Sequence, residues 1–353
     1  MTERRDPVRI AVVGMGWAGS RQTEAAAELG RDVEVVALVD NDPAFLAERA
    51  VALGVSRTYS TLEAALEDPD VEAVSICTPH ALHPDQAIAA ARAGRHILVE
   101  KPMAMTVPDA TRMIEAADTA GVVLYVAESE CYMPFAVQMR EIVQSGEPIG
   151  EITFASLISG YRATDPRYPG RREWLTLPEL GGTGTWYLQG IHAVAALRFV
   201  LGEVASVHVH EHRTTTFQRP DLEATMTAFL VLESGLTAYF VQTTETNIPE
   251  RLRGFHLYGE GGVVIGGRHG GYDQYLTTND QDAAGTHHAY PDLGFSEYAL
   301  ELEAFARTVR GDEVGPTDGR AERRSLAILE AGIESARIGR PVDLLARFPE
   351  LAN

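Results

Sequence analysis

Two side chains in this sequence have the chemistry to exchange a proton with an alcohol or a ketone. Lys101 lies in the segment HILVEKP, and His192 ends the segment GGTGTWYLQGIH. The unperturbed pKa of histidine lies near 6.5, so an imidazole can accept or donate a proton near neutral pH. Each residue also has an ordinary structural interpretation. Lys101 fits a surface position at a strand end, and His192 fits a buried position before the apolar run AVAALRFVLG.

A glycine-rich motif near the N-terminus indicates a dinucleotide site. VVGMGWAG places Gly14, Gly16 and Gly19 between a β-rich run and a helix-like segment, and Asp40 ends the next β-rich run. This order of strand, GxGxxG, helix, strand and Asp is typical of dinucleotide-binding folds. Gly14 permits the tight turn, Gly16 lets the backbone approach the pyrophosphate, and Gly19 lets the helix pack on the strand.

The cofactor interpretation favours NAD over NADP. The helix that begins near Trp17 and Ala18 supplies N–H donors and a positive dipole end to the phosphates. Asp40 can accept hydrogen bonds from ribose hydroxyls but repels a 2′-phosphate. The next two residues, Asn41 and Asp42, supply no Arg that could bind a 2′-phosphate. Beside a cationic nicotinamide, the pKa of Lys101 is expected to fall toward a range useful for proton transfer.

Alternating elements in the first third predict βαβ units and a parallel sheet. Further along, partial alternation with Gly or Ser-Gly turns predicts an antiparallel or mixed open sheet. The expected strands are 8–14, 33–40, 71–77, 96–101, 122–127, 151–159, 204–213, 224–234, 236–246 and 254–262. The expected helices are 17–29, 44–53, 84–94, 107–121, 297–309 and 320–338, with a strand and long loops over 266–291.

Composition narrows the classes of partner and compartment. The chain has 353 residues and a formal net charge of −20, which argues against nucleic acid and against an anionic membrane surface. Its 2 cysteines form no Cys/His cluster, so we expect no metal, and the adjacent His287 and His288 are interpreted as a loop. The apolar runs are too short to span a bilayer. We therefore expect a soluble, cytoplasmic protein.

Longer motifs carry a resemblance to a known family. The GxGxxG loop, TPHALHPDQAIAAARAGRHILVEKPMAMT, GGTGTWYLQGIHAVAALRFVLGE and EYALELEAFARTVRGDE follow one another over nearly the whole chain. In this order and spacing they resemble the glucose–fructose oxidoreductase/inositol dehydrogenase/rhizopine-catabolism (Gfo/Idh/MocA) family of NAD(P)-dependent oxidoreductases. The resemblance implies an α/β protein: a Rossmann domain over 1–127 with a doubly wound parallel sheet, and an α/β domain over 128–353. The second domain would have an open, mostly antiparallel sheet, and the C-terminal helices can pack back on the first domain.

The resemblance also implies roles for individual residues. Lys101 would orient substrate and cofactor and take part in proton transfer with His192. Glu100 would contact the ribose or nicotinamide region, and Pro102 would fix the turn, where a cis peptide bond is plausible. The loop after the third strand would lie beside the nicotinamide and comprises Thr78, Pro79, His80 and His83. His80 stands where many relatives have Asn.

Two acids that are frequent in the family are absent from this chain. Many relatives carry an Asp four residues before the histidine, where this chain has Leu188. Another Asp is frequent three residues after the histidine, where this chain has Ala195. A histidine base with lysine stabilisation of the alkoxide is sufficient for alcohol oxidation. The role of the Asp then passes to Gln189, Tyr187 or Glu173, or to no residue.

The expected substrate is a ring. Aromatic faces suit sugar rings, and arginines suit carboxylates or phosphates, although the arginines also fit a solvated loop. Glu128 and Tyr132 fall where relatives line the pocket. The expected substrate-binding residues are Lys101, Tyr132, Arg171, Arg172, Trp174, Trp186, Gln189 and His192.

Several functions fit these features. The first is an NAD-dependent dehydrogenase or reductase of a sugar, cyclitol or related ring. The alternatives are a dehydrogenase of a carboxylated cyclic dihydrodiol, a redox-neutral NAD enzyme that cleaves glycosides, and a non-catalytic NAD-binding regulator. Because an open sheet leaves a wide apolar face to cover, a homodimer or homotetramer is expected.

Overall fold

Six parallel strands form the first sheet, in the order β3-β2-β1-β4-β5-β6. The structure, a computed structural model, describes residues 6–30, 32–160, 162, 173–175, 177–181, 184–216, 222–249, 252–266 and 274–353. The strands are β1 (Val8–Val13), β2 (Val33–Val39), β3 (Thr58–Tyr59), β4 (Ala73–Ile76), β5 (His96–Glu100) and β6 (Leu124–Ala127). From β1 the chain adds β2 and β3 on one side of the sheet, and then β4, β5 and β6 on the other side. A ligand crevice is expected outside the carboxyl ends of β1 and β4, where the order of strands changes side.

Both faces of this sheet are buried. Ile10 and Val12 of β1 join the core under α1, whereas Ala11 and Val13 join the core under α4 and α5. This explains why β1 is a continuous apolar run rather than an alternating one. The helices are α1 (Trp17–Leu29), α2 (Pro43–Leu53), α3 (Leu62–Leu66), α4 (His83–Arg92) and α5 (Val107–Ala120), with the short 3₁₀ helix η1 (His80–Leu82) before α4. The sequence predicted each of these elements except β3, α3 and η1.

The second sheet has nine strands, in the order β14-β13-β12-β11-β7-β10-β9-β8-β15. Only β7 and β10 pair in parallel, so the predicted open, mostly antiparallel sheet is confirmed for the described residues. The strands are β7 (Ile152–Gly160), β8 (Val204–His212), β9 (Thr225–Leu232), β10 (Thr237–Thr243), β11 (Gly254–Gly259), β12 (Gly262–Gly266), β13 (Gln274–Thr278), β14 (Thr286–Ala289) and β15 (Val342–Asp343). The expectation of a loop at His287 and His288 is wrong, because both lie on β14, paired with β13.

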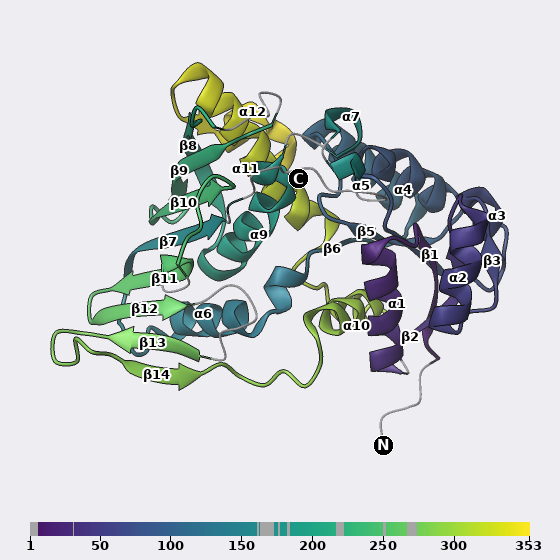
Figure 1. Cartoon of the computed structure of the whole chain (residues 1–353), viewed down its shortest axis with the longest axis horizontal. Helices are drawn as coiled ribbons and strands as arrows, with labels where there is room; N and C mark the ends of the chain where they lie inside the picture. The colour runs from purple at the N-terminus through teal and green to yellow at the C-terminus, as the bar shows by residue number, and fades with distance from the viewer. Residues whose placement is uncertain are drawn as a thin grey trace.

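After β6 the chain forms a further set of helices, the longer of which lie between the two sheets in Figure 1. They are α6 (Pro134–Ser145), α7 (Pro178–Gly181), α8 (Thr185–Leu188), α9 (Gly190–Leu201), α10 (Glu297–Val309), α11 (Gly319–Ile338) and α12 (Leu344–Arg347), with the 3₁₀ helices η2 (Ser129–Tyr132) and η5 (Pro349–Ala352). As the sequence predicted, α10 packs on α1 and α11 packs on α5, although both follow the second sheet in the chain. The domain division after residue 127 stays a prediction. None of the described helices has the length and apolarity that a membrane span requires.

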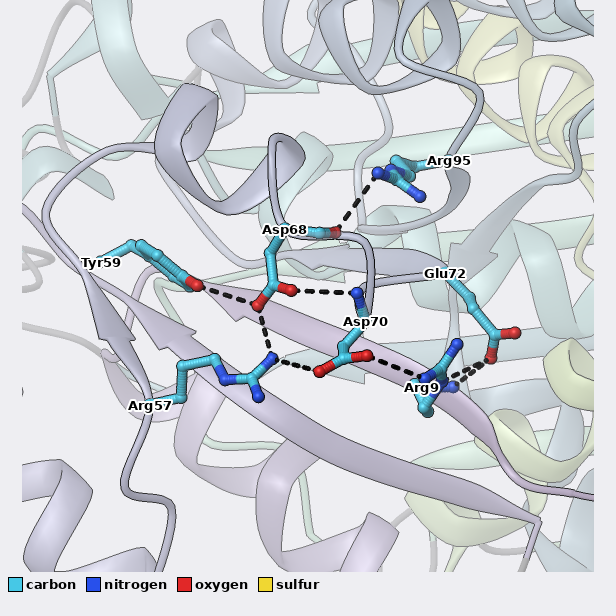
Figure 2. A network of polar contacts seen from close by, with 7 residues as sticks. All are labelled: Arg9, Arg57, Tyr59, Asp68, Asp70, Glu72 and Arg95. Carbon is cyan, nitrogen blue, oxygen red and sulfur yellow. Dashed lines mark hydrogen bonds and ion pairs between the residues drawn. The ribbon is translucent and has the colours of Figure 1, made fainter.

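A polar network ties three elements together at the edge of the first domain that lies opposite the crevice (Figure 2). The Asp68 carboxylate accepts hydrogen bonds from the Asp70 backbone N–H at 2.9 Å, the Tyr59 hydroxyl at 2.8 Å and the Arg57 guanidinium at 2.6 Å. Arg57 also contacts Asp70, whose other carboxylate oxygen accepts from Arg9. The backbone donor at Asp70 is the largest of several causes that lower the pKa of Asp68. The network therefore fastens the α3–β4 turn to β1 and β3.

We expect Asp68→Asn to lower the melting temperature at pH 7 by about 2–5 °C, because charge-assisted hydrogen bonds are lost. A carboxyl whose pKa is lowered by folding stabilises the protein above its unfolded pKa and loses this effect as the pH falls through its folded pKa. The difference between wild type and variant should therefore shrink in acid. Calorimetry from pH 7 downward measures it. Asp70→Asn is the control: its side chain is 49% exposed, so we expect a smaller change. Equal changes in the two variants would contradict the role of Asp68.

Candidate active site

A cavity of about 370 Å³ opens where the carboxyl ends of β4, β5 and β6 meet the segment from α8 into α9. Residues from both parts of the chain line it, and α10 adds one aromatic side chain. The lining residues are Gly16, Trp17, Ala18, Cys77, Thr78, His80, Glu100, Lys101, Ala127, Ser129, Trp174, Leu175, Leu188, Gln189, His192 and Tyr298. The cavity thus joins the predicted cofactor loop to both predicted proton-transfer residues.

The glycine loop has the shape that a pyrophosphate requires. Gly14 has φ of 89°, and a Cβ there would lie 2.7 Å from the Cys77 carbonyl oxygen. A Cβ at Gly19 would collide with the Gly14 carbonyl, so α1 can approach β1 only with glycine at this position. At Gly16, by contrast, no atom lies within 4 Å of the place a Cβ would take. Space is therefore open at Gly16, directly before the N-terminus of α1, where backbone N–H groups can receive phosphate.

Asp40 follows β2 and is only 6% exposed. One carboxylate oxygen accepts the Met15 backbone N–H at 2.9 Å, and the other accepts the Asp42 backbone N–H at 3.0 Å. Asp40 thus braces the glycine loop. Each oxygen has two acceptor sites, so the carboxylate keeps capacity for the ribose hydroxyls of a dinucleotide. These residues fit the cofactor that the sequence motif implies.

Lys101 follows β5, and its Nζ donates to the backbone carbonyl oxygen of Leu188 at 3.0 Å. The Lys101–Pro102 peptide bond is cis, as the resemblance made plausible. Leu188 occupies the position where the sequence comparison expected an Asp. At this position the backbone carbonyl oxygen accepts a hydrogen bond from the Lys101 ammonium. Lys101 is also the only lysine in the 353-residue sequence.

His192 lies in the first turn of α9, and its Nδ1 is 2.6 Å from Oε1 of Glu128. Glu128 directly follows β6 and is 0% exposed, whereas the His192 side chain is 15% exposed and lines the cavity. The same Glu128 oxygen accepts the Glu130 backbone N–H at 3.0 Å. The histidine therefore has a carboxylate partner, although none occurs in its own segment. The sequence alternatives Gln189, Tyr187 and Glu173 did not include it.

His80 lines the cavity but is only 4% exposed. Its Nδ1 is 2.8 Å from the Gly181 carbonyl oxygen, and its ring meets Trp174 edge to face at 4.8 Å. Burial, followed by the neighbouring His83 and Lys101, holds the pKa of His80 well below its usual value. The ring is therefore neutral at pH 7. Because a carbonyl oxygen only accepts, Nδ1 carries the hydrogen and Nε2 is left as an acceptor.

His83 supports the site from behind and does not line the cavity, which corrects the expectation that it contacts the cofactor. It is 0% exposed, and its ring nitrogens lie 3.1 Å from the Pro102 carbonyl oxygen and 2.9 Å from the Thr78 carbonyl oxygen. Burial lowers the pKa of His83 to about 4, so the ring is neutral. A neutral ring has one N–H, so it donates to only one of these two carbonyl oxygens, while it packs between the loop after β4 and the turn that carries Lys101.

Two acids lie at the cofactor side of the cavity: Glu100 in its lining and the buried Glu301 behind it. Burial raises the pKa of Glu100 to about 7, although Lys101 opposes this shift. Burial also raises the pKa of Glu301 on α10 well above its usual value. Gln22 on α1 donates to Glu301 at 2.9 Å and connects the two helices. Both acids are thus less readily ionised here than in water.

The structure sorts the predicted site residues into three groups. Lys101, His192, Trp174 and Gln189 share the cavity with Gly16, Trp17, Ala18, Thr78, His80 and Glu100. Gly14, Gly19, Asp40, Pro79 and His83 belong to the framework that shapes it rather than to its lining. Arg171 and Arg172 lie outside the described residues.

Two predicted substrate contacts are not among the residues that line this cavity. Trp186 is 0% exposed, donates its indole N–H to the Leu329 carbonyl oxygen at 3.0 Å and stacks on Phe240, so it is a core residue. Tyr132 lies in a second cavity, and its hydroxyl contacts those of Tyr125 and Thr317. Aromatic composition alone did not distinguish these two positions from the one at Trp174.

Sequence reasoning missed Tyr298 on α10, which lines the cavity and meets Trp17 edge to face at 6.1 Å. No local signal marks it, because α10 lies far from the glycine loop in the chain. In the part of the chain that the structure describes, no group of three His, Cys, Asp or Glu side chains is arranged to hold a metal ion.

The fold and the cavity define a class: a two-domain oxidoreductase with a dinucleotide-binding first domain. Residues 8–128 match the family model described as "Oxidoreductase family, NAD-binding Rossmann fold", and residues 136–265 match the "GFO/IDH/MocA C-terminal domain". The chain therefore belongs to the Gfo/Idh/MocA family of oxidoreductases.

Several similar proteins are named as dehydrogenases or reductases. The chain is 32% identical over 232 residues to 1-carboxy-3-chloro-3,4-dihydroxycyclohexa-1,5-diene dehydrogenase of Comamonas testosteroni, a match that spans 65% of this chain and 56% of that protein. It is 29% identical over 314 residues to 1,5-anhydro-D-fructose reductase of Ensifer adhaerens, covering 88% and 91% of the two chains. The WlbA dehydrogenase of Bordetella pertussis, solved with NADH and UDP-GlcNAcA, is 29% identical with a TM-score of 0.79, covering 96% and 98%.

Proposed function

We propose that this protein is an NAD-dependent dehydrogenase or reductase that acts on a secondary alcohol or ketone of a sugar, cyclitol or related ring. The observation that carries the proposal is that Lys101 and His192, which come from different halves of the chain, line one cavity with the glycine loop. The named relatives support the same class of reaction.

In this proposal His192 and Lys101 handle the proton and the charge. The carbinol carbon loses a hydride to the nicotinamide, which is the chemistry that the cofactor supplies. His192, whose Nδ1 faces Glu128, takes the hydroxyl proton at Nε2. Lys101, oriented by the Leu188 carbonyl, stabilises the negative charge that develops on the carbinol oxygen. In the reverse direction protonated His192 returns this proton to the oxygen, while Lys101 stabilises the charge on it.

A substrate panel tests the proposal. Polyols, aldoses, cyclitols, anhydrosugars and glycosides are offered with NAD, and the absorbance of NADH is followed. We expect reduction of NAD with at least one cyclic secondary alcohol. Glycoside cleavage without net NADH would favour the redox-neutral alternative, and tight NADH binding without any turnover would favour a regulator.

A second substrate class has support of its own. Trp174, Leu175 and Leu188 give one wall of the cavity an apolar character, which suits the flat, poorly hydroxylated face of a cyclohexadiene diol. The relative from Comamonas testosteroni is named for such a diol, which bears a carboxylate. We therefore include a carboxylated cyclic dihydrodiol in the panel as the second candidate.

We propose NAD rather than NADP as the cofactor, because the Asp40 carboxylate repels a 2′-phosphate. Asp40→Ser should weaken NADH binding roughly 10-fold and raise the NADPH:NADH affinity ratio roughly 100-fold, as expected when hydrogen bonds to a charged group are lost. Fluorescence titration with each reduced cofactor measures this without a substrate.

Asp40→Asn is the matched control for this prediction, since the amide oxygen can still accept the Met15 N–H and so keep the loop in place. We expect this variant to gain NADPH affinity while its NADH affinity falls less than in Asp40→Ser. An unchanged ratio in both variants would contradict the role of the charge.

We also propose that the outer face of the second sheet pairs with another copy of the chain. Phe229 is 37% exposed and Tyr239 is 48% exposed, and their rings touch edge to face at 5.5 Å. Such neighbouring exposed aromatics are usual at protein interfaces. Light scattering after size-exclusion chromatography distinguishes a dimer or tetramer from a monomer, and a monomer at micromolar concentration would contradict this proposal.

A further inference from the structure

We propose that Glu128 is the positioning residue for His192: its carboxylate fixes the orientation of the ring and the tautomer that leaves Nε2 to exchange the substrate proton. This inference deepens the proposed function and rests on the proton-transfer role of His192. It gives a role to a buried acid that the family motifs in the sequence did not place beside the histidine.

The contact itself specifies the tautomer. Oε1 of Glu128 lies 2.6 Å from Nδ1 of His192, the distance of a charge-assisted hydrogen bond. A carboxylate only accepts, so Nδ1 carries the hydrogen and Nε2 keeps its lone pair. Only the histidine lines the cavity, since Glu128 is 0% exposed. Glu128 therefore acts through His192 and does not touch a substrate.

The backbone fixes the carboxylate in turn. Glu128 is the N-cap of η2, and its Oε1 accepts the Glu130 N–H at 3.0 Å. The oxygen that faces His192 is thus held by the turn after β6. A ring held in this way loses less entropy when it reaches the geometry for proton transfer.

Glu128 lies in a cluster of acids with Glu100 and Glu301, both of which have raised pKa values. An ionised carboxylate in a protein interior is costly unless it is paired. After burial, the charge of Glu128 is one of the causes that raise the pKa of Glu100 and of Glu301. The neighbouring acids thus shift toward their neutral forms, while Glu128 has the imidazole as its partner.

The absent acid at Leu188 completes the argument. The Leu188 carbonyl holds Lys101, and Glu128 holds His192, so two separate groups orient the two proton-transfer residues. In this chain the histidine's carboxylate comes from the end of β6 rather than from the segment that precedes α9.

The test is Glu128→Gln, which keeps the shape and an acceptor oxygen but removes the charge. With the panel member that reduces NAD fastest, we expect kcat to fall roughly 10–100-fold, a part of what a general base contributes. We expect KM within about twofold, because Glu128 does not touch the substrate. The acidic half-point of kcat/KM should move about one pH unit lower or more, since the imidazolium loses its neighbouring negative charge.

Glu301→Gln is the matched control, because it removes a buried acid from the same cluster and leaves the His192 contact intact. We expect an unchanged acidic half-point in this variant. An equal shift in both variants, or no change in kcat and pH profile for Glu128→Gln, would overturn the proposal. Glu128→Asp keeps the charge but moves the carboxylate away by one methylene, so we expect its kcat and acidic half-point to lie between those of the wild type and Glu128→Gln. This variant replaces Glu128→Gln in the test if the Gln variant does not fold.

A readout without turnover separates this inference from the proposed function. Ring ¹⁵N NMR of the NADH complex, with the His192 signals assigned from His192→Ala, should show a protonated Nδ1 and a bare Nε2 in the wild type. Glu128→Gln should change this pattern or its titration. A wild-type ring protonated at Nε2 would overturn the inference even if a substrate is found. A panel without turnover would count against the proposed function alone.

Discussion

Replacing Lys101 by methionine is expected to lower kcat/KM roughly 10³-fold while NADH affinity stays within about threefold. The size follows from losing the positive charge that stabilises the oxyanion, a contribution of about 10²–10³-fold. Methionine retains most of the side-chain volume, so the turn at the cis Lys101–Pro102 bond and the Leu188 carbonyl keep their packing. Steady-state kinetics and fluorescence titration measure the two quantities.

Lys101→Arg separates charge from proton transfer. Guanidinium stays protonated throughout the accessible pH range, so it can stabilise an alkoxide but cannot exchange a proton. If Lys101 acts only through charge, the arginine variant should recover most of the activity that methionine loses. A Lys101→Met variant with wild-type kcat/KM would contradict a catalytic role for Lys101.

The sequence offers an unusual probe for the same residue. Because Lys101 is the only lysine, reductive methylation with ¹³C-formaldehyde labels this side chain and the N-terminal amine alone. The Lys101 methyl signal should shift when NAD or NADH is added, since the residue lines the cofactor cavity. A methyl signal that shifts with neither cofactor would indicate that Lys101 lies outside the cofactor site.

The features that the sequence predicted well are those whose physical cause is local. Gly14, Gly16 and Gly19 constrain the backbone of one turn, and Asp40 ends the strand that pairs beside it. Short apolar runs and helix caps likewise place most elements of the first domain. These signals are readable because the interacting residues lie within one βαβ unit.

The features that the sequence missed depend on partners far along the chain. Glu128 and His192 are 64 residues apart, and only the tertiary fold brings the carboxyl end of β6 to α9. In the sequence, Trp186 looks the same as an aromatic side chain of the pocket. Its contacts with Leu329 on α11 and Phe240 on β10 make it a core residue. The strand β14 lies in a stretch rich in Gly, Asp and Thr, where pairing with β13 outweighs weak local propensity.

His192→Ala is the second variant for which we expect a large effect, a fall in kcat/KM of roughly 10²–10³-fold. Without a general base, removal of the hydroxyl proton depends on hydroxide. The deficit should therefore shrink as the pH rises from 7 to 10, and added imidazole should restore part of the rate. Kinetics across this range, with NADH affinity as the control, measure the effect. Undiminished turnover at pH 7 would contradict the assignment of His192 as the base.

The same variant should also lose stability, because removing the imidazole leaves the Glu128 carboxylate buried without that partner. Breaking a buried pair in this way costs about 3–5 kcal/mol.

His192→Asn provides the comparison, since its amide can donate to Glu128 but cannot take a proton. We expect Asn to keep more of the stability while losing as much activity as Ala. The double variant Glu128→Gln/His192→Ala should be more stable than His192→Ala alone, since it no longer buries a carboxylate that has lost the imidazole. Two results together would contradict a stabilising contact between Glu128 and His192. The first is equal stability of His192→Asn and His192→Ala, and the second is a double variant no more stable than His192→Ala.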